Sequence, residues 1–193
     1  MKAKQFNNLK ELISSKRTLL VVLDEDLYEK KITELLKSLG KIGKKICYVS
    51  LNKPYKDIVE DFKENDIPLR NFFFVDVLSS HYIRPEPTKN CVFVSAPTDL
   101  HSIIMAILKT IKEERCEIII FDTLSTFLIY RQPFVVLKFV YRLLQEELRE
   151  DLKKIFITIR GGDILDEERE QLIKDVMMFA DMLITFEKNR KEF

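Results

Sequence analysis

Hydrophobic positions along this chain follow two alternating spacings. Short runs of consecutive apolar residues, many of them β-branched, predict strands that are buried on both faces. Between these runs the apolar residues recur every three or four positions, which predicts helices with one buried side. The predicted strands are residues 19–23, 45–51, 72–77, 91–95, 118–121, 155–159 and 182–186. The predicted helices are residues 29–39, a segment through Ile58 and Phe62, 99–114, 134 to about 152, and 167–179.

This alternation predicts the fold class, a three-layer α/β sandwich. Strand–helix–strand units form right-handed crossovers, so the sheet is expected to be mainly parallel, with helices on both faces. Because the sequence contains no linker or internal repeat, residues 1–193 are expected to form a single domain. Residues 182–193 supply the last strand and a charged tail that we expect to fray.

Composition narrows the range of functions. With 46% hydrophobic and 33% charged residues, the chain has the composition of a soluble globular protein. Lys and Arg total 32 and Asp and Glu total 31, so net charge indicates neither nucleic-acid nor membrane-surface binding. Charged residues such as Asp122 and Arg131 interrupt the longest apolar stretches, so no membrane span is predicted. The three cysteines are odd in number and lack a CxxC pair, which favours reduced thiols and a cytoplasmic location.

Polar residues directly after the predicted strands are the candidates for a site, because ligands bind beyond the carboxyl ends of parallel strands. The first strand is followed by three carboxylates, Asp24, Glu25 and Asp26, and by no glycine. The chain has only four glycines, at positions 40, 43, 161 and 162. Loops that wrap phosphate groups in backbone amides depend on glycine, so this scarcity argues against a phosphate-binding loop.

Three segments resemble the KaiC/RecA-like group of P-loop ATPases. KKICYVSLNKPYKDIVEDFKENDI is similar to the second strand of that group and its following helix. CEIIIFDTLSTFLIY resembles the Walker B strand, which matches Asp122 to the Walker B aspartate. DVMMFADMLITFEK is similar to a late segment in which an aspartate, here Asp181, precedes a strand. The resemblance implies a RecA/KaiC-like sheet and, in an active member, ATP hydrolysis with Mg²⁺.

The sequence departs from this family where the chemistry is concentrated. In place of GxxxxGK[ST] after the first strand it has DEDLYEKKIT, whose acids would face the phosphates. Each pair of like charges about 4 Å apart costs roughly 1–4 kcal/mol near a protein surface. The family's catalytic glutamate is replaced by Asn52 and Lys53, and Asn cannot act as a general base. We therefore predict a pseudo-ATPase that has no catalytic residues, binds no cofactor and keeps only a vestigial Asp122.

The function expected of such a domain is regulation or scaffolding through protein partners. The predicted helix starting at Phe134 is apolar around much of its circumference, so it is buried in its own core or against another chain. We therefore expect a protein partner or self-association. A divergent ATPase with an atypical phosphate loop is an alternative.

A second alternative is a receiver-like switch that depends on Mg²⁺ and phosphorylation. In this interpretation Asp24 and Asp26 hold the metal, Asp76 accepts phosphate and Ser95 is the switch hydroxyl. The length of the chain and the lack of a suitably placed Lys-Pro pair weigh against it. The acids also fit the simple start of a helix, whose dipole favours negative charge.

Overall fold

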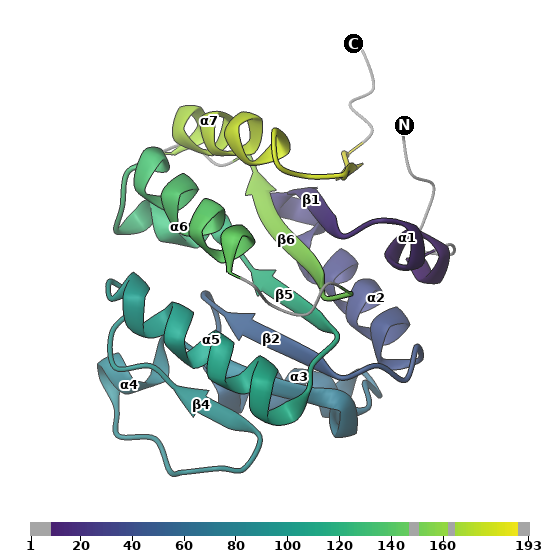
Figure 1. The fold of residues 1–193 in the computed structure, drawn as a ribbon, viewed down its shortest axis with the longest axis vertical. Coiled ribbons are helices and arrows are strands. Elements are labelled where there is room, and N and C mark those ends of the chain that lie inside the picture. Colours follow the sequence, from purple (N-terminus) through teal and green to yellow (C-terminus); the bar gives the residue numbers. More distant parts are fainter. Residues whose placement is uncertain (1–8, 147–150, 162–164, 189–193) are drawn as a thin grey trace.

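A single parallel sheet forms the centre of the molecule (Figure 1). The computed structural model describes residues 9–146, 151–161 and 165–188. Seven strands occur in the order β4-β3-β2-β5-β6-β1-β7, and every pair of neighbours is parallel. Their bounds are β1 Thr18–Asp24, β2 Ile46–Ser50, β3 Phe72–Asp76, β4 Cys91–Phe93, β5 Ile118–Asp122, β6 Lys153–Arg160 and β7 Met182–Phe186. The predicted α/β fold class is confirmed.

Helices cover both faces of this sheet and complete the three layers (Figure 1). Residues of α1, α2 and α3 share one apolar cluster with one face of the sheet, and residues of α5, α6 and α7 share another with the opposite face. The bounds are α1 Leu9–Ser15, α2 Tyr28–Gly40, α3 Tyr55–Glu64, α4 Ser79–Tyr82, α5 Leu100–Glu114, α6 Pro133–Gln145 and α7 Asp166–Met177. Successive side chains of a strand point to opposite faces, so each buried strand serves both clusters. None of the described helices has the length and apolar character to cross a bilayer.

Two details of the predicted elements are wrong. The helix expected to continue to about residue 152 ends at Gln145, and Glu146 is extended, with φ −61° and ψ 128°. Leu152 is buried just before β6, so its apolar character belongs to the entry of a strand and not to a helix. The short helix α1 was not predicted. Residues 189–193 of the tail expected to fray lie outside the described residues.

Aromatic side chains pack closely in the apolar cluster that α1, α2 and α3 share with the sheet, and a substitution tests this packing. Phe62 is 1% exposed, and its ring meets those of Phe72 and Phe74 with centroids 4.9 and 5.7 Å apart. Phe62→Ala is expected to lower the free energy of unfolding by about 3–5 kcal/mol, because the substitution leaves a cavity. Phe134→Ala, at a position 61% exposed, is the matched control. It is expected to change that free energy by at most about 1 kcal/mol, the scale of its contact with Lys138. Equal losses in urea titrations of the two variants would contradict this packing.

Candidate functional site

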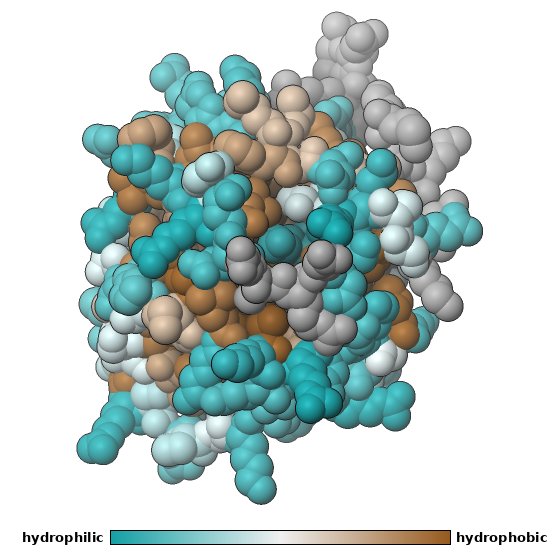
Figure 2. Space-filling model, viewed as in Figure 1, coloured by the Kyte–Doolittle hydropathy of each residue, from teal (hydrophilic) through white to brown (hydrophobic). Residues whose placement is uncertain are grey.

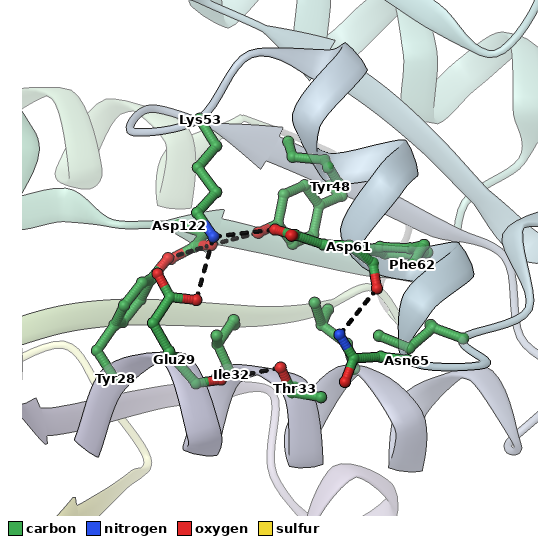
Figure 3. Close-up of a pocket in the computed structure, with 13 residues that line it drawn as sticks. Tyr28, Glu29, Ile32, Thr33, Tyr48, Lys53, Asp61, Phe62, Asn65 and Asp122 are labelled. Atoms are coloured by element: carbon green, nitrogen blue, oxygen red, sulfur yellow. Dashed lines mark hydrogen bonds and ion pairs between the residues drawn. The ribbon is translucent and has the colours of Figure 1, made fainter. Parts of the chain in front are cut away.

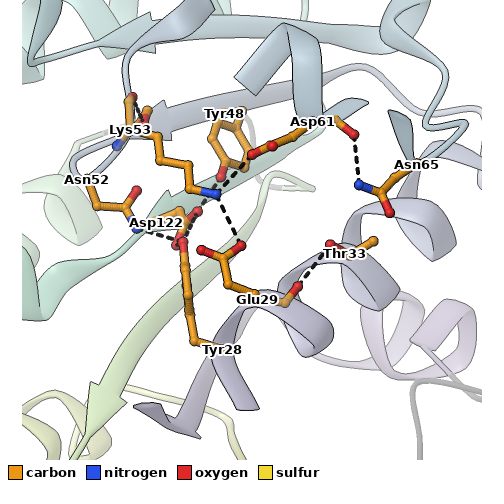
Figure 4. Close-up of polar contacts among 10 residues, drawn as sticks. Tyr28, Glu29, Thr33, Tyr48, Asn52, Lys53, Asp61, Asn65 and Asp122 are labelled. Carbon is orange, nitrogen blue, oxygen red and sulfur yellow. Dashed lines mark hydrogen bonds and ion pairs between the residues drawn. The ribbon is translucent and has the colours of Figure 1, made fainter. Parts of the chain in front are cut away.

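The carboxylate of Asp122 is the centre of the candidate site (Figure 4). It lies at the carboxyl end of β5, a wholly buried strand, and is itself 1% exposed. The Tyr28 hydroxyl lies 2.8 Å from each of its oxygens, Oδ1 and Oδ2, and the Tyr48 hydroxyl donates to Oδ2. Both tyrosines therefore direct their polar ends at one buried carboxylate.

Tyr28 reaches Asp122 because the connection between β1 and α2 is short. After Asp24 ends β1, one 3-10 turn of three residues, Glu25–Leu27, leads directly to Tyr28, the first residue of α2. Tyr48 comes from the middle of β2, the strand that pairs with β5. The site is therefore assembled from one helix start and two adjacent strands.

Asn52 extends this network toward the surface. Its Nδ2 donates to the Tyr28 hydroxyl oxygen at 2.6 Å. Its Oδ1 is buried and has no hydrogen-bond partner among the described residues. A buried polar atom of this kind is commonly satisfied by an ordered water molecule.

Lys53, beside Asp122, forms salt bridges to two helices. Its Nζ lies 3.1 Å from Glu29 Oε2 on α2 and 2.9 Å from Asp61 Oδ2 on α3. Burial alone would lower the pKa of Lys53, but hydrogen bonds to Asp61 and Glu29 outweigh burial and hold that pKa above its ordinary value. The lysine is therefore a fixed cation whose charge is already matched by two carboxylates.

A small cavity lies among these side chains between α2 and α3 (Figure 3). Its volume is about 60 Å³, and Asp122, Lys53 and Asn65 are among the residues that line it. Sites for drug-sized ligands measure about 300–1,000 Å³, whereas a water molecule needs only about 10–15 Å³. The cavity therefore has room for a few water molecules and not for a nucleotide.

Burial sets the protonation chemistry of the site. Desolvation raises the pKa of Asp122 to about 6, against the opposing effect of the hydrogen bonds from Tyr48 and Tyr28 and of the positive charge of Lys53. Burial also raises the pKa of both tyrosines, and the negative charge of Asp122 raises it further. The hydroxyls therefore remain protonated donors, and Asp122 is the group that titrates.

The acids proposed for a receiver-like site are not brought together. Asp24 ends β1 and Asp76 ends β3, and three strands (β6, β5 and β2) lie between them. Four steps of about 4.8 Å put the two strands roughly 19 Å apart. Within the described residues, no group of three or more His, Cys, Asp or Glu side chains is arranged to hold a metal ion.

Each of these acids has a partner of its own. Asp24 accepts from the Arg160 guanidinium at 3.2 Å, and Asp26 pairs with Lys188 at 2.5 Å. Asp76 is buried and accepts from the backbone N–H groups of Tyr55, Leu78 and Ser79 and from the Ser79 hydroxyl. Ser95, the proposed switch residue, is exposed after β4.

The pattern along the sequence located only part of this site. It singled out Asp122, Asn52 and Lys53 by their places at strand ends, and these three do lie together. It missed Tyr28 and Tyr48, the direct partners of the carboxylate. A tyrosine inside a buried strand is a usable signal, because its hydroxyl needs a hydrogen-bond partner.

Comparisons with known proteins bear on the fold. No family model matches the sequence, and no curated protein matches it either. The structure is similar to the KaiC-like protein PH0186 from Pyrococcus horikoshii OT3, with a TM-score of 0.55 and 12% identity over 91% of this chain and 74% of that one. It is also similar to the uncharacterised protein PH0321 from P. horikoshii, which was crystallised with an unknown peptide. Here the TM-score is 0.66 and the identity 14% over 92% of this chain and 80% of that one. The chain therefore has the KaiC/RecA-like fold.

The raised pKa of Asp122 predicts a pH dependence of stability. The folded pKa of about 6 exceeds the ordinary value of 3.8, so folding favours the protonated form. The contribution of Asp122 to stability is then greatest below about pH 4 and is lost as the pH rises through 6, by about 3 kcal/mol in total. Asp122→Asn removes this titration. The wild-type free energy of unfolding, minus that of the variant, should fall by roughly 2–2.5 kcal/mol between pH 4 and pH 7 in urea titrations. Parallel curves for the two proteins would contradict the assignment.

Loss of one hydroxyl provides an independent test of the network. Tyr48→Phe leaves Asp122 with one donor fewer, so the free energy of unfolding at pH 7 should fall by about 1–3 kcal/mol. The pKa of Asp122, followed by carbon-13 NMR, should rise further. Tyr141→Phe, on an exposed side chain of α6, is the matched control and should change stability by no more than about 0.5 kcal/mol. An unchanged Asp122 titration in Tyr48→Phe would show that the hydroxyl does not support the carboxylate.

Proposed function

We propose that this chain is a KaiC/RecA-like domain that does not hydrolyse nucleotide and acts as a regulatory or scaffolding module through protein partners. One observation carries the first half of the proposal. Asp122, which the family resemblance matches to the Walker B aspartate, has both carboxylate oxygens engaged by the hydroxyls of Tyr28 and Tyr48. A Mg²⁺–nucleotide complex at this position would have to displace a buried tyrosine.

The surroundings of Asp122 support the same proposal. The short turn Glu25–Leu27 takes the place of a glycine-rich loop, so this connection offers no cradle of backbone amides. Asn52, at the position matched to the catalytic glutamate, is committed to the Tyr28 hydroxyl, and neighbouring Lys53 is committed to Glu29 and Asp61. Neither side chain can activate a water molecule as a base at neutral pH.

Exposed apolar side chains support the second half, a role in binding proteins. Figure 2 shows the face formed by α5, α6 and α7, where hydrophobic side chains gather among the helices. The inner side of helix α6 packs into the protein core through Val136, Phe139, Val140 and Leu143. On its outer side Phe134 and Tyr141 remain exposed, and the ring of Tyr141 meets that of Phe179 with centroids 5.7 Å apart. Exposed aromatic clusters are typical of protein interfaces.

The similar protein PH0321 adds support, because it was crystallised with a bound peptide. By analogy of fold, we propose that this chain also recognises polypeptide. The proposed function therefore consists of two separable statements, the absence of nucleotide chemistry and the presence of a polypeptide-binding surface.

Ligand-dependent stability tests the first statement. The full chain is heated with buffer alone, with Mg²⁺, with Mg²⁺–ATP, and with Mg²⁺ plus acetyl phosphate. A ligand at a hundred times its dissociation constant adds about 2.7 kcal/mol, which for a chain of this size corresponds to a rise in Tm of roughly 5–11 °C. We expect no rise with any addition and no release of phosphate from ATP.

A rise with Mg²⁺–ATP that is lost in Asp122→Asn would overturn the proposal and identify a divergent ATPase. Titration with a fluorescent ATP analogue gives a second readout that does not depend on the stability of the variant. A rise with Mg²⁺ plus acetyl phosphate that is lost in Asp76→Asn would instead identify a receiver-like switch.

A further inference from the structure

The strand β7 forms one edge of the sheet (Figure 1). In the described part of the chain it pairs only with β1, through the register Leu19↔Met182 to Leu23↔Phe186. Its sequence, Met-Leu-Ile-Thr-Phe, contains no charged residue and no proline. Strands of this kind at an edge are templates for pairing with another strand.

The opposite edge differs in ways that protect it. There β4 is only three residues long, Cys91–Phe93. The loop before it contains Pro85 and Pro87 and folds back in an antiparallel bridge between Thr88 and Cys91. Short edge strands and prolines are common protections against unwanted pairing. The described residues give β7 none of these protections, so β7 is the edge suited to accept a strand.

The register shows which backbone groups of β7 point outward. The Arg17 carbonyl accepts from Lys154 N–H on the β6 side, whereas the Thr18 carbonyl accepts from Asp181 N–H on the β7 side. Backbone groups alternate in direction along a strand, so the even-numbered residues of β1 bond to β7. In a parallel pair with this register, Met182 and Ile184 bond to β1. Leu183 and Thr185 then direct their N–H and C=O groups away from β1.

We propose that β7 pairs antiparallel with β7 of a second copy of this chain, so that the two sheets join across a twofold axis. The outward groups of Leu183 then meet those of the second copy's Thr185, and the reverse pair forms by symmetry. A twofold interface requires a self-complementary surface. Each β7 strand carries one such pair of outward residues, Leu183 and Thr185. In one antiparallel register, all the outward N–H and C=O groups of the two pairs form hydrogen bonds with each other.

Side chains in this register are compatible with the pairing. Met182 lies opposite Phe186 of the second copy, and contacts between sulfur and an aromatic ring are favourable. Asp181 and Glu187 also fall opposite each other, but both carboxylates are engaged within their own chain. Asp181 accepts from the N–H groups of Arg17 and Thr18, and Glu187 pairs with Arg160 at 3.0 Å.

This inference rests on the proposed protein-binding function and names a partner for it. Sedimentation and light scattering of the full chain, over a concentration series spanning about 1 to 100 µM, should give a mass twice the 22.9 kDa of one chain. Thr185→Pro removes an outward N–H that β1 does not use, a position where an edge strand tolerates proline. The variant should dimerise at least about tenfold more weakly.

Thr185→Val is the matched control, because it keeps the N–H group and the β-branched shape. It should dimerise as the wild type does. Circular dichroism and Tm of both variants establish that the fold is intact. A monomer throughout the series, or a dimer that Thr185→Pro leaves unchanged, would overturn the proposal.

Disulfide trapping tests the register and remains readable if the proline variant fails to fold. A Leu183→Cys chain mixed with a Thr185→Cys chain should form an interchain disulfide. Residues in a hydrogen-bonded antiparallel pair lie about 5.5 Å apart at Cα, within disulfide range. The native cysteines Cys47, Cys91 and Cys116 are buried and should not interfere. Crosslinking of the Leu183→Cys chain with itself, or none in the mixture, would overturn this register.

The remaining outcomes separate this inference from the proposed function. A monomer that shows no response to nucleotide refutes the β7 dimer and leaves the proposed function intact. A dimer that binds Mg²⁺–ATP supports the β7 pairing and refutes the proposed function. A monomer whose β7 edge binds a strand of another protein overturns the second copy as occupant.

Discussion

The need to satisfy one buried carboxylate governs the chemistry of this molecule. Asp122 ends the central strand β5, and the hydroxyls of Tyr28 and Tyr48 occupy its oxygens. An ionised carboxylate without partners in such a place would be costly, so the donors are a condition of keeping it there. Because they come from α2 and β2, the network ties the start of α2 and the β2–β5 pair together. A buried hydrogen-bond network therefore lies where the family resemblance implies a reaction centre.

Parallel α/β folds bind ligands beyond the carboxyl ends of their strands, and here two tyrosine hydroxyls engage the Asp122 carboxylate at the end of β5. Beside Asp122, Lys53 forms salt bridges to Glu29 on α2 and to Asp61 on α3. The cavity that these side chains line, in the part of the chain that the structure describes, measures about 60 Å³. The same scaffold can thus keep its fold while the chain's own side chains engage the carboxylate at the end of its central strand.

The outer surface has two features that differ in how they could contact another chain, namely exposed apolar side chains and the backbone groups of an edge strand. Exposed aromatic and methionine side chains, such as Tyr141 and Met178, present apolar surface that a partner could bury. Burial of apolar surface does not fix the orientation of the partner, because the hydrophobic effect is not directional. Pairing at the edge of β7 would fix the orientation of a partner strand, because backbone N–H and C=O groups specify both orientation and register. The two edges of the sheet differ in this respect, because β4 has only three residues and follows a loop with two prolines. A chain that protects one edge and leaves the other suitable for pairing can extend its sheet in one direction only.

The local spacing of hydrophobic residues was enough to predict the α/β class and the seven strands, because buried strands and amphipathic helices have distinct periods. Local spacing failed at the end of α6, where Leu152 fits a helix and a buried strand entry equally well. It identified Asp122, Asn52 and Lys53 as candidates, since strand ends mark the crevice. Only the tertiary structure showed that Tyr28 and Tyr48, distant along the chain, meet Asp122, and that Asp24 and Asp76 do not meet. The physical reason is that periodicity reports which face of an element is buried, whereas hydrogen-bond partners depend on which strands become neighbours in the sheet.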